Sequence, residues 1–181
     1  MSILIGDIGN TVTKISLINI KSFKIKKIIY FYSQNILSKK KLIKNLKKIT
    51  KDKKINKIAL FSSVVPKYKE IIKKILFQNY GIKLKEIKDK NINKIIKINI
   101  KNKEEVGSDR IANAVGVFKK YKVNSIVVDF GTATTFDVIT DKGIYNGGVI
   151  APGINLSIKS LSKSADQIPI FLLRKQKKII G

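Results

Sequence analysis

The sequence predicts an α/β protein built from two similar halves. The chain has 181 residues, a length that suits one large domain or two small ones. Short β-branched segments alternate with segments whose apolar residues recur at helical spacing. A strand followed by Asp-x-Gly and then threonine occurs twice, beginning at Asp7 and at Asp129. Such an internal repeat indicates a duplicated structural element.

The first part of the chain is expected to open with three strands and to continue with alternating helices and strands. Apolar, β-branched and aromatic runs mark the strands, and Ser38 is suited to cap the first helix. This order looks like an RNase H-like half, the unit from which actin-like kinases are built. The predicted elements are strands over 2–8, 12–19 and 25–32, a helix over 38–50, a strand over 57–65, a helix over 67–78, and short strands over 82–87 and 95–100.

The second part is expected to begin with a helix and to repeat the strand meander. Ser108 is a candidate cap for that helix, and Asp141-Lys-Gly143 supplies a turn between the last two strands. We expect an N-terminal RNase H-like half over 1–112 and an incomplete C-terminal one over 113–181. The predicted elements are a helix over 108–121, strands over 125–130, 134–139 and 144–150, and a short helix over 154–164.

Composition excludes several kinds of chemistry. The chain has no cysteine and no histidine, so disulfides, thiolate zinc sites and imidazole bases are excluded. Proton transfer near neutral pH must then fall to Asp, Glu, Lys or Tyr. No apolar run reaches the roughly 20 residues of a membrane span, and the N-terminus does not look like a signal peptide. We therefore expect a soluble, cytoplasmic protein without a membrane partner.

The net charge of +26 has two interpretations. It favours binding to nucleic acid or another polyanion, or it reflects a drift of composition toward lysine. Arg110 and Arg174 are the only arginines, and the lysines are spread along the whole chain. Specific readers of nucleic acid depend on arginine for bidentate contacts. We therefore favour drift and expect no specific nucleic-acid partner. Half of the 12 acidic residues fall between Glu104 and Asp141.

The first repeated turn has the composition of a phosphate-binding loop. Glycine between two strands allows a ligand to approach the backbone closely, and Asn and Thr add side-chain donors. Asp7 is placed to hold magnesium through water, and Lys14 returns toward the phosphates as a point charge. An ordinary hairpin turn is the alternative for a single such motif. The second turn, Asp129-Phe-Gly131-Thr132, repeats the pattern and favours a paired clamp on nucleotide phosphates.

A third motif, Gly107-Ser-Asp-Arg110, stands at the start of a predicted helix, where free backbone amides attract anions. Asp109 is the best candidate for a general base, because the acceptor in a phosphoryl transfer needs only a carboxylate that takes its proton. Arg110 is suited to pair with a carboxylate or with the moving phosphoryl group. The alternative is a surface salt bridge at a helix start. The chain has neither a P-loop motif nor a dinucleotide-binding glycine motif.

These motifs make the chain resemble the type III pantothenate kinases of the sugar-kinase/actin-like group. The resemblance rests on Asp7-x-Gly-Asn-Thr, Gly107-Ser-Asp-Arg-Ile, the run from Val128 to Asp137, and Gly147-Gly-Val-Ile-Ala-Pro-Gly153, which stand in the order and spacing of that family. It implies ATP-dependent phosphorylation of pantothenate, the first step of coenzyme A synthesis. It also implies Mg²⁺, a monovalent cation (K⁺ or NH₄⁺) and a homodimer.

The resemblance also implies a role for each motif residue. Asp109 would be the catalytic base, Asp129 would bind the monovalent cation, and Asp7 would bind Mg²⁺ through water. The residues on pantothenate would be Gly107, Ser108, Asp109 and Arg110. The residues on ATP would be Asp7, Ile8, Gly9, Asn10, Thr11, Val12, Thr13, Lys14 and Thr132.

The sequence departs from the family pattern at three places. A tyrosine that contacts pantothenate in the family is Ile100 here, and the usual alanine of the third motif is Ser108. The family continues past Gly181 with a Lys-Asn-Thr segment and an adenosine-binding glycine turn, so we expect a C-terminally shortened second half. Two alternatives stay open: a non-catalytic accessory or regulatory protein that keeps the fold, and a nucleic-acid binder driven by charge.

Overall fold

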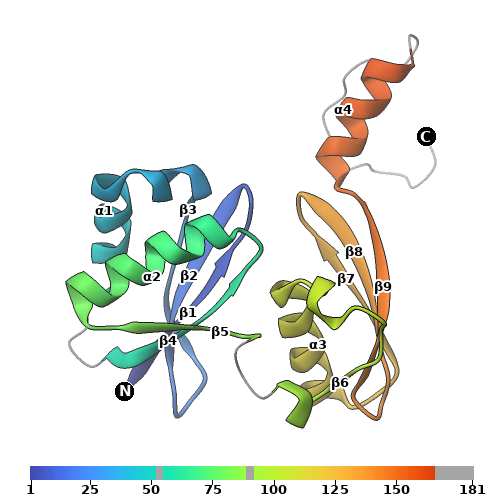
Figure 1. Ribbon diagram of the computed structural model, residues 1–181, viewed down its shortest axis with the longest axis horizontal. Helices are drawn as coiled ribbons and strands as arrows, with labels where there is room; N and C mark the ends of the chain where they lie inside the picture. Colours follow the sequence, from blue (N-terminus) through green and yellow to red (C-terminus); the bar gives the residue numbers. More distant parts are fainter. Residues whose placement is uncertain (52–54, 89–91, 166–181) are drawn as a thin grey trace, which may run out of the picture. The chain divides into compact units, whose positions relative to one another are not determined.

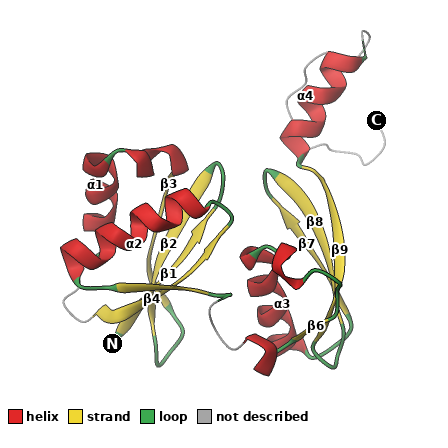
Figure 2. Cartoon of the chain, viewed as in Figure 1, coloured by secondary structure: helices red, strands yellow, loops and turns green. Residues whose placement is uncertain are grey.

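The computed structural model describes residues 1–51, 55–88 and 92–165, and these form a mixed α/β chain with two sheets (Figures 1 and 2). The end of the expected C-terminal half, residues 166–181, lies outside the described residues. Contacts divide the chain into a first unit, residues 1–127 with 137–147, and a second unit, residues 128–136 with those from 148 onward. The boundary expected at residue 112 remains a prediction. Within the described ranges, no helix is both long and apolar enough to cross a membrane.

The first sheet has five strands in the order β3-β2-β1-β4-β5. β1 pairs antiparallel with β2, and β2 pairs antiparallel with β3, as the predicted meander requires. β1 pairs parallel with β4, and β4 pairs parallel with β5. The chain reaches β4 from β3 through one helix, and β5 from β4 through another, and such crossovers are what parallel pairing requires. The strands are β1 (Ser2–Ile8), β2 (Val12–Asn19), β3 (Ile25–Tyr32), β4 (Ile55–Ser63) and β5 (Lys83–Glu86).

Two helices, α1 (Lys39–Ile49) and α2 (Pro66–Tyr80), cover one face of this sheet. Their apolar stripes pack against alternate residues of β1, including Leu4 and Ile8, in a single buried cluster. The predicted cap is confirmed, since the Ser38 hydroxyl accepts a hydrogen bond from the amide of Lys41. A short 3₁₀ helix, η1 (Ser33–Leu37), was not expected between β3 and α1.

The second sheet has the order β6-β9-β8-β7 and contains the predicted second meander. The strand expected over 95–100 shrinks to two residues and pairs parallel with β9 in this sheet. The strands are β6 (Lys97–Ile98), β7 (Ser125–Phe130), β8 (Ala133–Ile139) and β9 (Ile144–Pro152). The remaining elements are α3 (Ser108–Tyr121), α4 (Ile154–Ser164), η2 (Ile92–Lys94) and η3 (Lys103–Glu105).

A second buried cluster joins α3 to this sheet. Ile111 and Ala114 of α3 pack with Ile139 of β8 and Tyr145 of β9. The expected cap of α3 was wrong, because Gly107 is the N-cap residue and Ser108 is the first residue of the helix. The Ser108 hydroxyl is engaged elsewhere, on the backbone of β4, and so is not used as a cap.

Substitution of two glycines tests the packing of the first sheet. A Cβ on Gly6 would overlap the ring of Phe61, which is fully buried, whereas a Cβ on Gly116 of α3 meets nothing within 4 Å. We expect Gly6→Ala to lower the free energy of unfolding by about 1–3 kcal/mol. Gly116→Ala should raise it by about 0.5–1 kcal/mol, because alanine favours the helix. Urea unfolding measures both, and equal stability of the two variants would contradict the packing described here.

Candidate functional site

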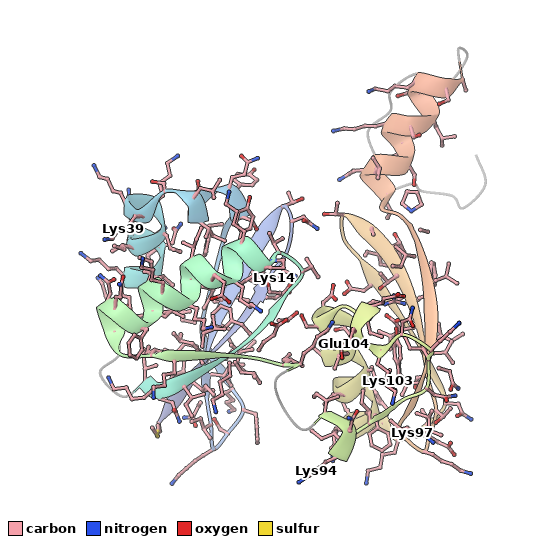
Figure 3. The ribbon with its side chains drawn as sticks, in the orientation of Figure 1. Lys14, Lys39, Lys94, Lys97, Lys103 and Glu104 are labelled. Atoms are coloured by element: carbon pink, nitrogen blue, oxygen red, sulfur yellow. The ribbon has the colours of Figure 1, made fainter. Side chains whose placement is uncertain are left out.

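The turn between β1 and β2 carries the first predicted phosphate loop. Gly9, Asn10 and Thr11 form the turn, and the amide of Gly9 donates to the carbonyl of Val12 at 3.2 Å. Asp7 pairs with Lys14 across the two strands, so both side chains lie on the same face of the sheet. That face is opposite to the one covered by α1 and α2. Lys14, labelled in Figure 3, is exposed.

The neighbouring pair, Ile8 and Thr13, points into the buried cluster side of the sheet. Ile8 and Thr13 are both 0% exposed, so only their backbone groups are available to a ligand. Asn10 and Thr11 at the tip of the turn are exposed. The predicted ATP-binding run therefore divides into side chains that can meet phosphate oxygens and side chains that hold the turn in place.

Ser33, which the sequence analysis missed, fixes the conformation of this turn. Its hydroxyl donates to the carbonyl of Gly9 at 2.7 Å and lies 2.8 Å from the hydroxyl of Thr13. Its amide donates to the carbonyl of Thr11 at 2.9 Å. One fully buried serine in η1 thus holds the turn at three points. A hydroxyl in such a position satisfies backbone groups that would be costly to bury alone.

Ser108 joins the start of α3 to the end of β4. Its hydroxyl accepts from the amide of Ser63 and donates to the carbonyl of Ser63, each at 2.9 Å. Ser62 also contacts it, with the two hydroxyls 3.4 Å apart. Ser62 is the register partner of Asp7 on the adjacent strand. The first unit therefore brings the Asp7 turn and the start of α3 to the same end of the five-stranded sheet.

Asp109 sits in the first turn of α3, and its carboxylate folds back over Gly107. Its Oδ1 accepts from the amide of Arg110 at 2.8 Å, and a Cβ on Gly107 would overlap this oxygen. Gly107 has φ −57° and ψ 143°, which any residue can adopt. Glycine is therefore required here by the space that the Asp109 carboxylate occupies and not by the backbone.

Arg110 is held by Asp137 of the second sheet, and Tyr145 of the same sheet holds Asp137. Its Nε donates to Oδ1 of Asp137 at 2.8 Å, and its Nη2 makes an ion pair with the same oxygen at 2.6 Å. The hydroxyl of Tyr145 donates to that oxygen as well, at 2.6 Å. Asp137 is 0% exposed and Tyr145 is 1% exposed. Arg110 was expected to pair with a carboxylate or with the moving phosphoryl group, and in the structure it pairs with the carboxylate of Asp137.

The charges in this group stabilise one another. Burial lowers the pKa of the Arg110 guanidinium, but the hydrogen bond and negative charge of Asp137 raise it by more, so the net pKa is raised. Burial, and then the hydrogen bond to Asp137, raise the pKa of Tyr145 well above its ordinary value. Arg110 therefore stays charged and Tyr145 stays protonated as a donor at neutral pH.

The second predicted phosphate loop belongs to the second unit. Asp129 lies near the end of β7, and Gly131 and Thr132 connect it to β8; all three residues are exposed. The amide of Gly153 donates to the carbonyl of Thr132 at 3.1 Å. A Cβ on Gly153 would overlap the carbonyl oxygens of Gly131 and Thr132, so the Ala-Pro-Gly segment packs directly against this turn.

The residues suit a divalent ion that arrives with the nucleotide. No three acidic side chains gather into a chelating group anywhere in the described ranges. Magnesium in kinase sites is held by one or two carboxylates together with substrate phosphates and water, which fits Asp7 beside the turn. Asp129 carries a hard oxygen ligand at the second turn.

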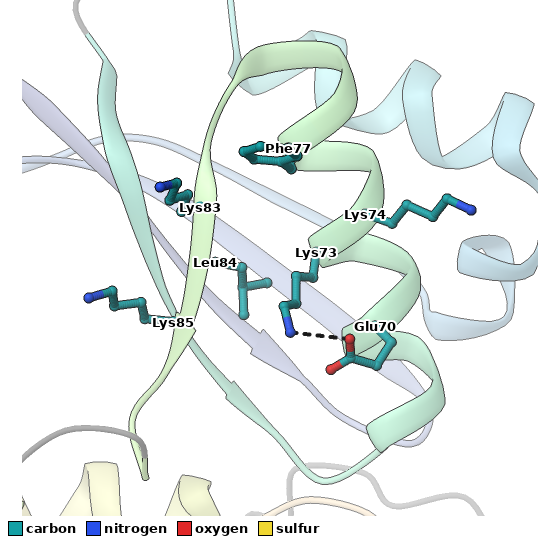
Figure 4. A pocket seen from close by; sticks show the side chains of 7 residues that line it. All are labelled: Glu70, Lys73, Lys74, Phe77, Lys83, Leu84 and Lys85. Carbon is teal, nitrogen blue, oxygen red and sulfur yellow. Dashed lines mark hydrogen bonds and ion pairs between the residues drawn. The ribbon is translucent and has the colours of Figure 1, made fainter.

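Two surface grooves lie apart from these residues. One, of about 420 Å³, runs between α2 and β5 over Phe77 and Leu84 (Figure 4). The other, of about 680 Å³, lies beside α1. Lysines line most of both grooves, and neither contains a predicted site residue. The lining lysines are Lys73, Lys74, Lys83 and Lys85 in the first groove and Lys27, Lys40, Lys44, Lys47, Lys48 and Lys51 in the second.

The chain is similar to known proteins over nearly its full length. The family described as type III pantothenate kinase matches residues 3–181. A type III pantothenate kinase of Pelagibacter ubique is 47% identical over 182 residues, which cover 99% of this chain and 70% of that protein. A second one, of Desulforapulum autotrophicum, is 35% identical and covers 99% of this chain and 70% of that protein.

A solved structure shares the fold. The crystal structure of a protein described as a Baf family transcriptional activator from Campylobacter jejuni matches with a TM-score of 0.56 and 21% identity, covering 96% of this chain and 69% of that one. At this identity the likeness concerns the fold alone. The family match and the two relatives carry the assignment, and they agree with the motifs at Asp7, Gly107 and Asp129. The chain belongs to the type III pantothenate kinase family.

Proposed function

We propose that this chain transfers the γ-phosphoryl group of ATP to the 4′-hydroxyl of pantothenate, in the cytoplasm, as the first step of coenzyme A synthesis. Its membership of the kinase family supports this activity. The observation that carries the assignment of roles is the link from Ser108 to Ser63. It sets the start of α3, with Asp109, at the end of β4 beside the Asp7 turn.

The residues divide the work of the transfer. The backbone of the Gly9–Thr11 turn, the Asn10 and Thr11 side chains and Lys14 hold the ATP phosphates, and Thr132 contacts ATP from the second turn. Pantothenate lies at the start of α3, along Gly107 to Arg110, where the helix terminus favours its carboxylate. Mg²⁺ bound near Asp7 supplies charge neutralisation at the phosphates. Asp129 binds K⁺ or NH₄⁺, and the active form is a homodimer.

Asp109 accepts the proton of the attacking hydroxyl. A bond forms between that hydroxyl oxygen and the γ-phosphorus, and the bond from the γ-phosphorus to the bridging oxygen of ADP breaks. The proton moves to the Asp109 carboxylate and later leaves to water. A carboxylate suffices because the transition state is loose and the proton leaves as charge develops on the acceptor. Positioning of the two substrates supplies most of the remaining rate.

The purified chain tests this proposal directly. We expect pantothenate-dependent formation of ADP in the presence of Mg²⁺ and ATP, with 4′-phosphopantothenate identified by mass spectrometry. Calorimetric titration with ATP–Mg²⁺ and with pantothenate is the companion measurement. Binding of both ligands without turnover would overturn the kinase proposal and favour the accessory, non-catalytic alternative.

Substitution of Asp109 tests the base. Asp109→Asn keeps the oxygen that accepts from the Arg110 amide but cannot take up the proton. We expect kcat to fall by about 10²–10⁴-fold, the usual contribution of a general base, with little change in KM for ATP. Asp141→Asn, on the exposed turn between β8 and β9, is the matched control and should behave as wild type. Unchanged kcat in Asp109→Asn would refute the assignment.

Gly107→Ala tests the placement of the same carboxylate without removing it. The new Cβ overlaps only the flexible Asp109 side chain, and the backbone angles suit alanine. We expect the unfolding midpoint to stay unchanged while kcat falls by up to about 10²-fold, because the base is displaced from its acceptor. If stability falls instead and kcat per folded molecule is kept, Gly107 serves the fold and not the orientation of Asp109.

The monovalent cation is tested at Asp129. Wild-type activity should rise when KCl or NH₄Cl replaces NaCl at constant ionic strength. Asp129→Asn should remove this difference, because a neutral amide is a weaker ligand for a hard cation. Flame photometry of bound K⁺ gives a readout besides activity. Equal activation of wild type and variant by K⁺ would show that the cation, if it binds, binds elsewhere.

A further inference from the structure

Asp137 and Tyr145 form a buried anchor for the first turn of α3. Asp137 lies on β8 and Tyr145 on β9, and Oδ1 of Asp137 accepts from both the Arg110 guanidinium and the Tyr145 hydroxyl. The helix α3 and the two strands of the β8–β9 hairpin thus converge on a single carboxylate group. Neither Asp137 nor Tyr145 is exposed to a ligand, so their effect on chemistry must pass through Arg110.

The anchor is a costly arrangement to build into a core. A fully buried carboxylate requires compensation by charge and hydrogen bonds, and here Arg110 and Tyr145 provide both at Oδ1. The second oxygen, Oδ2, is buried without a hydrogen-bond partner among the described residues. An apolar trio would pack the same space without this desolvation cost. The polar group therefore calls for a role beyond packing.

The position of Arg110 points to that role. It directly follows Asp109, and its amide donates to the Asp109 carboxylate at 2.8 Å. A side chain fixed at Nε and Nη2 restricts the backbone from which it projects, and that backbone carries the donor that orients Asp109. The planar guanidinium suits this use, since its donors have a fixed geometry.

We propose that Asp137 and Tyr145 are positioning residues for the phosphoryl transfer, which act by fixing Arg110 and thereby aim the Asp109 carboxylate at the acceptor hydroxyl. The proposal rests on the proposed function of Asp109 as the base. It assigns a role to the aspartate that ends the motif from Val128 to Asp137 and to a tyrosine that no motif marks. A purely structural role would affect stability but leave the orientation of Asp109 unchanged.

Tyr145→Phe is the sharpest test, because it removes one hydroxyl and keeps the ring in the core. Ile139→Val is the matched control, since Ile139 lies 0% exposed in the same cluster and contributes no polar group to the anchor. We expect Tyr145→Phe to lower kcat by about 10-fold to 10²-fold, the scale of a small misplacement of a catalytic group, with KM for ATP unchanged. Ile139→Val should keep the wild-type kcat.

Hydrogen exchange at the Arg110 amide gives a second readout that needs no turnover. This amide donates to Asp109, so its exchange rate reports the orientation of that carboxylate. Exchange should become faster in Tyr145→Phe and in Asp137→Asn, and should stay as in wild type in Ile139→Val. Asp137→Asn keeps the shape of the side chain but weakens the pairing with Arg110, so the larger change is expected there.

The outcomes separate the inference from the function on which it rests. An active wild type with unchanged kcat and unchanged Arg110 exchange in Tyr145→Phe overturns the positioning role and leaves the kinase proposal standing. A fall in kcat that Ile139→Val matches in size also overturns it, because destabilisation alone then explains the loss. An inactive wild type overturns the proposed function, and the positioning role with it.

Discussion

The hydroxyl of Ser108 is the contact on which the arrangement of the site depends. It accepts from the amide and donates to the carbonyl of the same residue, Ser63, at the end of β4. It thereby provides hydrogen-bond partners for two backbone groups at the end of the strand. Ser108 is itself only 1% exposed. Loss of the hydroxyl would leave these groups without their partner, which costs about 1–3 kcal/mol for a buried polar group. The start of α3 is held to β4 by this pair of bonds.

Close approaches at glycine complete the local geometry. Gly6 admits the ring of Phe61 behind the first loop, Gly107 admits the Asp109 carboxylate, and Gly153 admits the carbonyls of the second loop. At each of these glycines, atoms of a neighbouring residue already occupy the space that a Cβ would need. None of the three has a positive φ. Close packing, and not backbone conformation, is therefore the reason for glycine at these positions.

The sequence predicted the elements better than the contacts between them. Alternation and helical spacing are local signals, so the meander of β1 to β3, the cap at Ser38 and the turn at Gly143 were confirmed. The strand over 95–100 was predicted too long, because its strand partner among the described residues, β9, lies far along the chain and pairs with two of its residues. Assignment of Ser108 as a cap failed for the same reason, since its partner is on β4.

Ser33 and the anchor at Asp137 were missed because their roles come from tertiary contacts. Ser33 meets Thr13 across 20 positions, and Arg110 meets Asp137 across 27. No pattern in the sequence indicated this burial, because the apolar residues on either side of position 137, Phe136 and Val138, are the exposed ones, while Asp137 points inward. An inward carboxylate requires a cationic partner, and that partner had to be sought elsewhere in the chain.

The choice of arginine at position 110 follows from the same constraint. All but two of the 38 basic residues are lysine. On the surface, as in the lysine-lined grooves beside α1 and α2, the positive charge is solvated, and lysine carries it as well as arginine. Beside a fully buried carboxylate lysine is a poorer partner, because it lacks the planar guanidinium whose hydrogen-bond donors point in fixed directions. The buried Asp137 carboxylate thus explains why an arginine stands at position 110 of a lysine-rich chain.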